Sequence, residues 1–254
     1  MKRKRATKER VDPRIFERVS ALQRKKTGNV SRAEVNRMVN QALSRSHDLK
    51  GVDLNFNGTA TTTLTDNSAA HLINPLILGT GSFRRADRSV SMESIRVRWG
   101  LTFTYDRHAV SGNVENTTYR ISIVYDKKPE ASIPTWSNVF ANLDNAGAFT
   151  QTLRSSVSFT NTDRFSVLRD EVGDLNPNFY YKGGVLDDKC KYSISGDWYI
   201  NMRGKKSIYG VDKTTANVTD FEEGAVYVFV RVSHSDTHAV TGYAGTVRMR
   251  YRDN

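Results

Sequence analysis

The chain has 254 residues, a formal net charge of +11, 38% hydrophobic residues and a single cysteine. No stretch approaches the roughly 18 consecutive apolar residues of a membrane-spanning helix. One cysteine excludes an intrachain disulfide and a cysteine-rich metal site. The length allows a terminal arm followed by one all-β domain of about 200 residues.

The positive charge is concentrated at the N-terminus. Residues 1–50 contain 15 Lys/Arg and 5 Asp/Glu, a net charge of +10, whereas residues 51–254 contain 23 and 22, a net charge of +1. Such segregation is typical of an arm that neutralises a polyanion. We therefore predict a basic nucleic-acid-binding arm over residues 1–50 and a near-neutral body over residues 51–254. The candidate nucleic-acid-binding residues of the arm are Lys2, Arg3, Lys4, Arg5, Lys8, Arg10, Arg14, Arg18, Arg24, Lys25 and Lys26.

The run from Lys2 to Arg10 also has the composition of a nuclear import signal. A solvated tail that only improves solubility is the alternative interpretation. The roles are compatible, because one basic tail can serve all of them.

Two short amphipathic helices are predicted in the arm. Asp12 and Pro13 form a favourable helix start, and Ser31 to Glu34 fits a capping box. Each apolar stripe is too narrow to stabilise a helix alone. The second helix is a candidate for self-association of three copies, with packing on its own subunit as the alternative. Its candidate contact residues are Val35, Met38, Val39 and Leu43.

From residue 51 onward the apolar period changes from 3.6 to 2, which indicates β-strands. The clearest strand runs from Ile95 to Tyr105, where six apolar residues alternate with others. Residues 226–232 are apolar on nearly both faces and predict a central strand. Further strands are expected at 119–125 and 247–251, and weaker ones at 54–64, 165–169, 191–200 and between 207 and 218. Residues 134–140 predict a helical turn inside a loop.

About eight strands joined by long polar loops favour a two-sheet antiparallel sandwich over a short-looped barrel. We therefore predict an all-β fold.

No catalytic constellation is visible. His234 and His238 have i, i+4 spacing, but they follow a strand in what looks like a solvated loop. Asp187, Asp188 and Asp197 leave a calcium ion between subunits as an open alternative. We predict no enzymatic activity, no cofactor and no metal.

Arginines recur at alternate positions in two of the predicted strands. Arg96 and Arg98 share one strand face, and Arg248, Arg250 and Arg252 share another. Acidic residues on neighbouring strands could balance these stripes; alternatively, they extend the nucleic-acid surface of the arm as additional phosphate contacts. No aromatic residues interleave with them, so we do not expect base stacking here.

Four sequence segments together resemble those of a known family. They are residues 79–81 leading into Arg84 and Arg85, residues 123–129, residues 163–170 and residues 245–251. Their order behind a basic arm resembles the capsid proteins of small circular Rep-encoding single-stranded DNA viruses. It is also similar to the related satellite-necrosis-type and geminivirus-like coat proteins. The resemblance covers the chain from Asp53 to the C-terminus.

This resemblance implies a single eight-stranded jelly roll, about sixty copies of which form the smallest icosahedral shell with their arms on the genome. The implied partners are further copies of the chain, single-stranded DNA (or RNA) and the host nuclear import machinery. The implied locations are the virion and the host nucleus. The alternative function is a non-capsid nucleic-acid-binding protein, a nuclear chaperone or movement-type factor that uses the jelly roll for docking.

Overall fold

The chain divides into two units, residues 1–48 and residues 49–254. The computed structural model describes parts of the second unit. The described residues are 49–64, 67–81, 83–106, 117–143, 146, 148–175, 181–182, 185–186, 189–211, 214–233 and 239–253. Residues 1–48 of the predicted arm, including both predicted helices, lie outside these residues. Among the described residues, no helix is long and apolar enough to cross a membrane.

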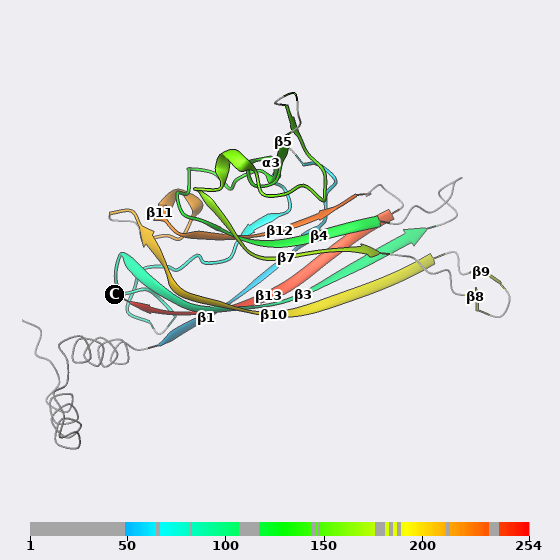
Figure 1. Cartoon of the computed structure of the whole chain (residues 1–254). Coiled ribbons are helices and arrows are strands. Elements are labelled where there is room, and N and C mark those ends of the chain that lie inside the picture. The colour runs from blue at the N-terminus through cyan, green and yellow to red at the C-terminus, as the bar shows by residue number, and fades with distance from the viewer. Residues whose placement is uncertain are drawn as a thin grey trace, which may run out of the picture. The chain divides into compact units, whose positions relative to one another are not determined.

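Two antiparallel sheets lie face to face (Figure 1). One has the order β1-β13-β3-β10-β11, and the other has the order β2-β12-β4-β7. The strands of the first sheet are β1 (Lys50–Thr59), β3 (Ser89–Asp106), β10 (Lys189–Tyr209), β11 (Phe221–Glu223) and β13 (Ala239–Asp253). The strands of the second are β2 (Ala70–Leu72), β4 (Thr117–Asp126), β7 (Phe165–Leu175) and β12 (Ala225–Val232).

The order of these strands identifies a jelly roll. Without the short β11, eight strands remain: the first, eighth, third and sixth in chain order form one sheet, and the second, seventh, fourth and fifth form the other. This interleaving of two Greek keys defines the fold. The predicted eight-stranded all-β jelly roll is confirmed.

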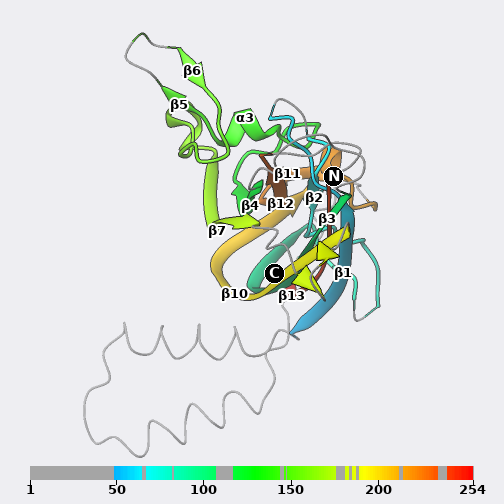
Figure 2. The ribbon, with the colours of Figure 1, turned by 90° about the vertical axis from the view of Figure 1, so that its right-hand side faces the viewer.

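The connections carry short elements. They are α3 (Trp136–Val139), β5 (Asn142–Leu143), β6 (Phe149–Thr150), η2 (Phe159–Asn161), β8 (Tyr181–Lys182), β9 (Val185–Leu186) and η3 (Val218–Asp220). The β5–β6 hairpin projects away from the sandwich (Figure 2).

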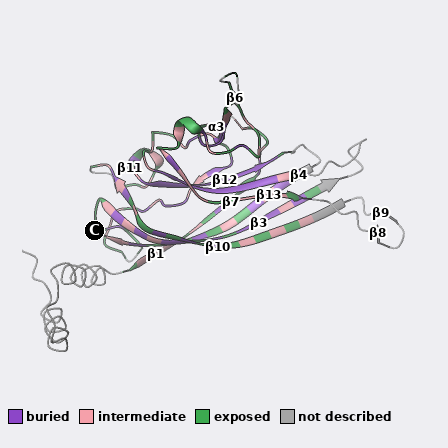
Figure 3. Ribbon diagram, in the orientation of Figure 1, coloured by how far each residue is buried: buried purple, intermediate pink, exposed green. Residues whose placement is uncertain are grey.

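The core lies between the sheets. The inward positions of β3 are buried from Ile95 to Phe103, as the alternation in the sequence predicts. All eight residues of β12 are buried, which confirms its prediction as a central strand (Figure 3). Gly245 on β13 makes room for a core aromatic side chain, because a Cβ there would lie 2.2 Å from the Phe56 ring.

The β4–β7 connection covers the outer face of the four-stranded sheet. It contains the predicted helical turn, α3, whose N-cap is Thr135. Trp136 and Phe140 are fully buried, and the Arg120 guanidinium lies 4.0 Å from the centre of the Phe140 ring. This sheet therefore packs on both of its faces.

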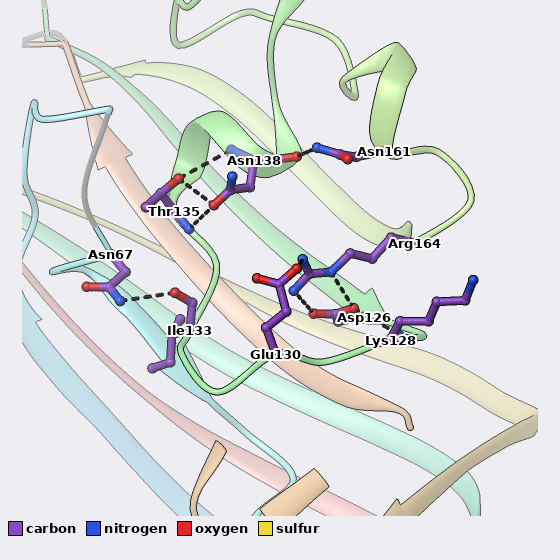
Figure 4. Close-up of polar contacts among 9 residues, drawn as sticks. All are labelled: Asn67, Asp126, Lys128, Glu130, Ile133, Thr135, Asn138, Asn161 and Arg164. Atoms are coloured by element: carbon purple, nitrogen blue, oxygen red, sulfur yellow. Dashed lines mark hydrogen bonds and ion pairs between the residues drawn. The ribbon is translucent and has the colours of Figure 1, made fainter. Parts of the chain in front are cut away.

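Two of the sequence segments that carry the family resemblance, residues 123–129 and 163–170, meet at the β4–β7 edge. Arg164 donates two hydrogen bonds to the fully buried Asp126, at 3.0 and 2.8 Å, and also pairs with Glu130 (Figure 4). Further along the same pairing, Arg120 donates two hydrogen bonds of 2.8 Å to Asp170. These charged residues join the two strands of the pairing.

Some strand limits differ from those predicted. β1 spans Lys50–Thr59 rather than 54–64. β10 continues to Tyr209, and the described residues between 207 and 218 form no separate strand. The sequence also missed β2, whose three residues are too few to show a period. β2 forms because its backbone pairs with β12, opposite residues 227–229.

Candidate nucleic-acid interface

Several predicted site residues lie outside the part of the chain that the structure describes. They include the basic residues from Lys2 to Lys26, the self-association residues Val35 to Leu43, the loop histidines His234 and His238, and Asp187 and Asp188. Their predicted roles remain predictions. The arginines of the strands are described, and they define a second candidate surface.

The two arginine stripes lie on one face of one sheet. β13 pairs with β3 so that Arg248 is opposite Arg96. β1 and β10 extend this row, with Asp53 opposite Arg248 and Tyr199 opposite Arg96. Residues opposite one another on paired strands point to the same side of the sheet. The row is therefore Asp53, Arg248, Arg96 and Tyr199, on the face directed away from the core. We refer to this outward face of β1, β13, β3 and β10 as the basic face.

Two aspartates hold three of the arginines. Arg96 donates to both carboxylate oxygens of Asp197, at 2.9 and 2.6 Å, and Arg98 donates to the same carboxylate at 3.3 Å. Hydrogen bonds from Arg96, together with the charges of Arg96 and Arg98, lower the pKa of Asp197. Asp197 therefore stays ionised as an arginine partner.

Arg248 and Asp53 form a second bidentate pair. The guanidinium donates to the two carboxylate oxygens at 2.7 and 2.6 Å, and this hydrogen bonding lowers the pKa of Asp53. Both pairs are exposed, so they contribute little to the stability of the fold. Their main effect is to orient the guanidinium groups on the face.

The remaining two arginines differ from each other. Arg252 follows a register shift after Arg250, is only 22% exposed, and donates to Glu93 at 2.9 Å. Arg250 is exposed and lies between Gly51 and Ser94. Within the described residues, no carboxylate lies within 4.0 Å of the Arg250 guanidinium.

An exposed aromatic side chain lies among these arginines. Tyr199 on β10 is 72% exposed and stands opposite Arg96. The expectation that no aromatic residue interleaves with the arginines is therefore wrong. The sequence could not reveal this arrangement, because Tyr199 and Arg96 are brought opposite one another only by the β3–β10 pairing.

The basic face carries an excess of positive charge. Around the row of Asp53, Arg248, Arg96 and Tyr199, four arginines (Arg96, Arg98, Arg248 and Arg250) and two aspartates (Asp53 and Asp197) give a net charge of +2. Acidic neighbours thus balance the stripes only in part. Among the described residues, no group of three or more His, Cys, Asp or Glu side chains could hold a metal ion.

The structure is a jelly roll with a basic outward face. Two of the sequence segments that carry the family resemblance are joined in it at the β4–β7 edge. These features limit the classes of protein to which the chain can belong. The sequence matches the Geminivirus coat protein/nuclear export factor BR1 family over residues 2–254. The chain belongs to this family. The predicted resemblance to geminivirus-like coat proteins is confirmed.

The description of this family names a viral coat protein and a nuclear export factor, and it names no enzyme. Of the functions considered from the sequence, the coat protein is named in the family's description. No curated protein matches the chain.

Among solved structures, the chain is similar to a protein described as "Crystal structure of 60-mer BFDV Capsid Protein". The identity is 9% and the TM-score 0.19, and the match covers 82% of this chain and 95% of that chain. The assignment of this chain to the jelly-roll fold rests on the order of its own strands.

Proposed function

We propose that this chain is the coat protein of a virus with a single-stranded DNA genome, and that its copies close into a small icosahedral shell around that genome. The observation that carries this proposal is the family match over residues 2–254. The jelly roll in the described unit supports it, because such sandwiches are used widely as capsid domains.

Assembly requires each copy to offer contacts to its neighbours. The connections between strands expose large apolar side chains that are suited to this role. Phe159 is 77% exposed, Phe83 is 68% exposed and Val211 is 65% exposed. Burial of apolar area stabilises an interface by about 25 cal/mol per Å². Weak contacts of this kind, repeated by symmetry, stabilise a closed shell.

The basic arm supplies the affinity for the genome in this proposal. With a net charge of +10 for residues 1–50, about sixty arms carry about 600 positive charges, comparable with the phosphates of a small genome once other cations contribute. The segment from Lys2 to Arg10 would also engage the nuclear import machinery. The expected locations are the virion and the host nucleus.

A nuclear export or movement factor is the second candidate, because the family's description includes an export factor. Such a protein would bind nucleic acid as a small species. Particle size separates the two candidates.

Electron microscopy of the purified full chain tests the proposal. We expect uniform round particles about 20 nm across, the size of a closed shell of small domains. Small dispersed species at every salt concentration, with nucleic acid present, would support the export-factor candidate instead.

Deletion of residues 1–26 tests the role of the arm. We expect the shells to lose their nucleic acid, because 11 of the 15 Lys/Arg of residues 1–50 are removed. The ratio of absorbance at 260 and 280 nm measures the content. An unchanged ratio in the truncated particles would contradict the proposed role of the arm.

A further inference from the structure

We propose that the basic face binds single-stranded nucleic acid, with Tyr199 stacking on a base and the neighbouring arginines contacting phosphates. This inference deepens the proposed function and depends on it for the identity of the ligand. It adds a binding surface on the jelly roll to the one predicted on the arm.

The geometry of the row places a stacking group beside phosphate ligands. Tyr199 and Arg96 occupy opposite positions on paired strands, and Arg248 is one strand further. Neighbouring strands lie about 4.8 Å apart, so the Cα atoms of Tyr199 and Arg248 are about 10 Å apart. A base on Tyr199 therefore has guanidinium groups within reach of its own phosphates and the adjacent ones.

The charges of the face favour a polyanion as its occupant. Asp197 is shared by Arg96 and Arg98, and Arg250 has no acidic partner among the described residues. Two of the four arginine charges are therefore not compensated on the face. A second copy of the chain is a poorer occupant, because its body carries a net charge of +1 rather than a negative net charge.

The exposed tyrosine favours a single strand over a duplex. Bases can stack on an aromatic side chain only where they are not already stacked in a helix. Guanidinium contacts to phosphate carry no sequence information, so we expect little sequence preference.

The first experiment compares variants of the full chain at Tyr199. Binding is measured by fluorescence anisotropy with an oligothymidylate of about 40 nucleotides, several times the site size of a single-strand-binding fold, and with a duplex of equal length. Moderately high salt is used, because it weakens the electrostatic contribution of the arm more than stacking.

We expect Tyr199→Ala to weaken single-strand binding about 5- to 150-fold, the effect of losing one stacked base, and to leave duplex binding unchanged. Tyr199→Phe keeps the ring and is expected to bind like the original chain. Tyr199→Thr removes the ring but retains a high β-propensity, so it repeats the test if the alanine variant is unstable. Leu143→Ala is the matched control, because it removes an exposed apolar side chain from the β5–β6 hairpin, which belongs neither to the basic face nor to the proposed contacts between copies.

The second experiment changes the charge of the face in both directions. Arg250→Ala is expected to reduce the slope of log K against log salt by about 0.7 for a single strand. Asp197→Asn is expected to tighten binding, because it releases Arg96 and Arg98 from their shared carboxylate. Arg154→Ala is the control, since this exposed arginine pairs with Asp174 away from the face.

Unchanged single-strand affinity in Tyr199→Ala, Tyr199→Thr and Arg250→Ala would overturn the inference. Loss of shells with unchanged affinity in these variants would also overturn it, because it would identify the face as a contact between copies. Electron microscopy keeps the two proposals separate. A chain that forms no shells contradicts the proposed coat function, whereas normal shells combined with unaffected binding by these variants contradict only the role of the basic face.

Discussion

Removal of the buried ion pair between β4 and β7 gives a strong test of the physical account of the fold. Arg164→Met takes away the guanidinium but keeps an unbranched apolar stem near the Phe165 ring, above which Arg164 now lies at 4.6 Å. Asp126 has no exposed surface, and its other described contact is a 3.0 Å hydrogen bond from the Lys128 N–H. The variant therefore leaves a buried carboxylate without its cation.

Such a change costs about 3–5 kcal/mol of unfolding free energy. For a domain of this size it corresponds to a fall of about 6–20 °C in the melting temperature. Urea unfolding, monitored by tryptophan fluorescence, measures it. The matched control is Arg154→Met, because the Arg154–Asp174 pair is exposed on both sides and should be worth less than about 1 kcal/mol.

The double variant Asp126→Asn with Arg164→Met adds a further check. It removes the buried charge while the asparagine oxygen still accepts from Lys128, so it should be more stable than the single Arg164→Met variant. A loss below about 1 kcal/mol for Arg164→Met, or a double variant less stable than it, would refute the reasoning.

Two further predictions concern other parts of the sandwich. His71 lies between the sheets, shares a 2.6 Å hydrogen bond with the Tyr243 hydroxyl, and has a pKa that burial lowers. The unfolded chain therefore binds more protons than the folded chain below about pH 6.5, so the stability of the fold should fall as the pH drops through that region. His71→Gln should make the urea midpoint depend less on pH. A midpoint that changes equally with pH in both proteins would contradict this. Gly224 has φ +78°, and a Cβ there would lie 1.9 Å from the Lys206 carbonyl oxygen. A left-handed backbone alone costs a non-glycine residue about 1–2 kcal/mol, so Gly224→Ala should lower the free energy of unfolding by clearly more than this amount. Gly204→Ala, at φ +83° with open space around it, is the control and should cost only that smaller amount in thermal unfolding; equal costs would exclude the steric explanation.

The sequence predicted the fold class well where one strand carries its own signal. The alternation from Ile95 to Tyr105 and the apolar run in β12 are local patterns, and both strands lie where they were expected. β2 has no such pattern, because its three residues form a strand only through pairing with β12. The continuation of β10 to Tyr209 was missed for a related reason. A register shift between Asn201 and Lys205 interrupts the period that the sequence analysis follows.

The candidate site shows the same division. The stripes of Arg96 with Arg98 and of Arg248 with Arg250 were visible, since each lies within one strand. Their position side by side, the carboxylates that hold them and the exposed ring of Tyr199 were not visible. Arg252 was grouped with the stripe, but the shift after Arg250 leaves it mostly covered beside Glu93.

The sequence by itself thus determined the properties that depend on neighbours along the chain. These are the basic arm, the period-2 strands, the turn at α3 and the order of the segments that carry the family resemblance. Only the tertiary structure decided which strands pair, because the register between strands depends on contacts between residues that are far apart in the chain. Asp197 and Arg98 are 99 positions apart, and Asp53 and Arg248 are 195 apart. The basic face is composed entirely of such pairs, so it becomes a surface only when the two Greek keys have closed.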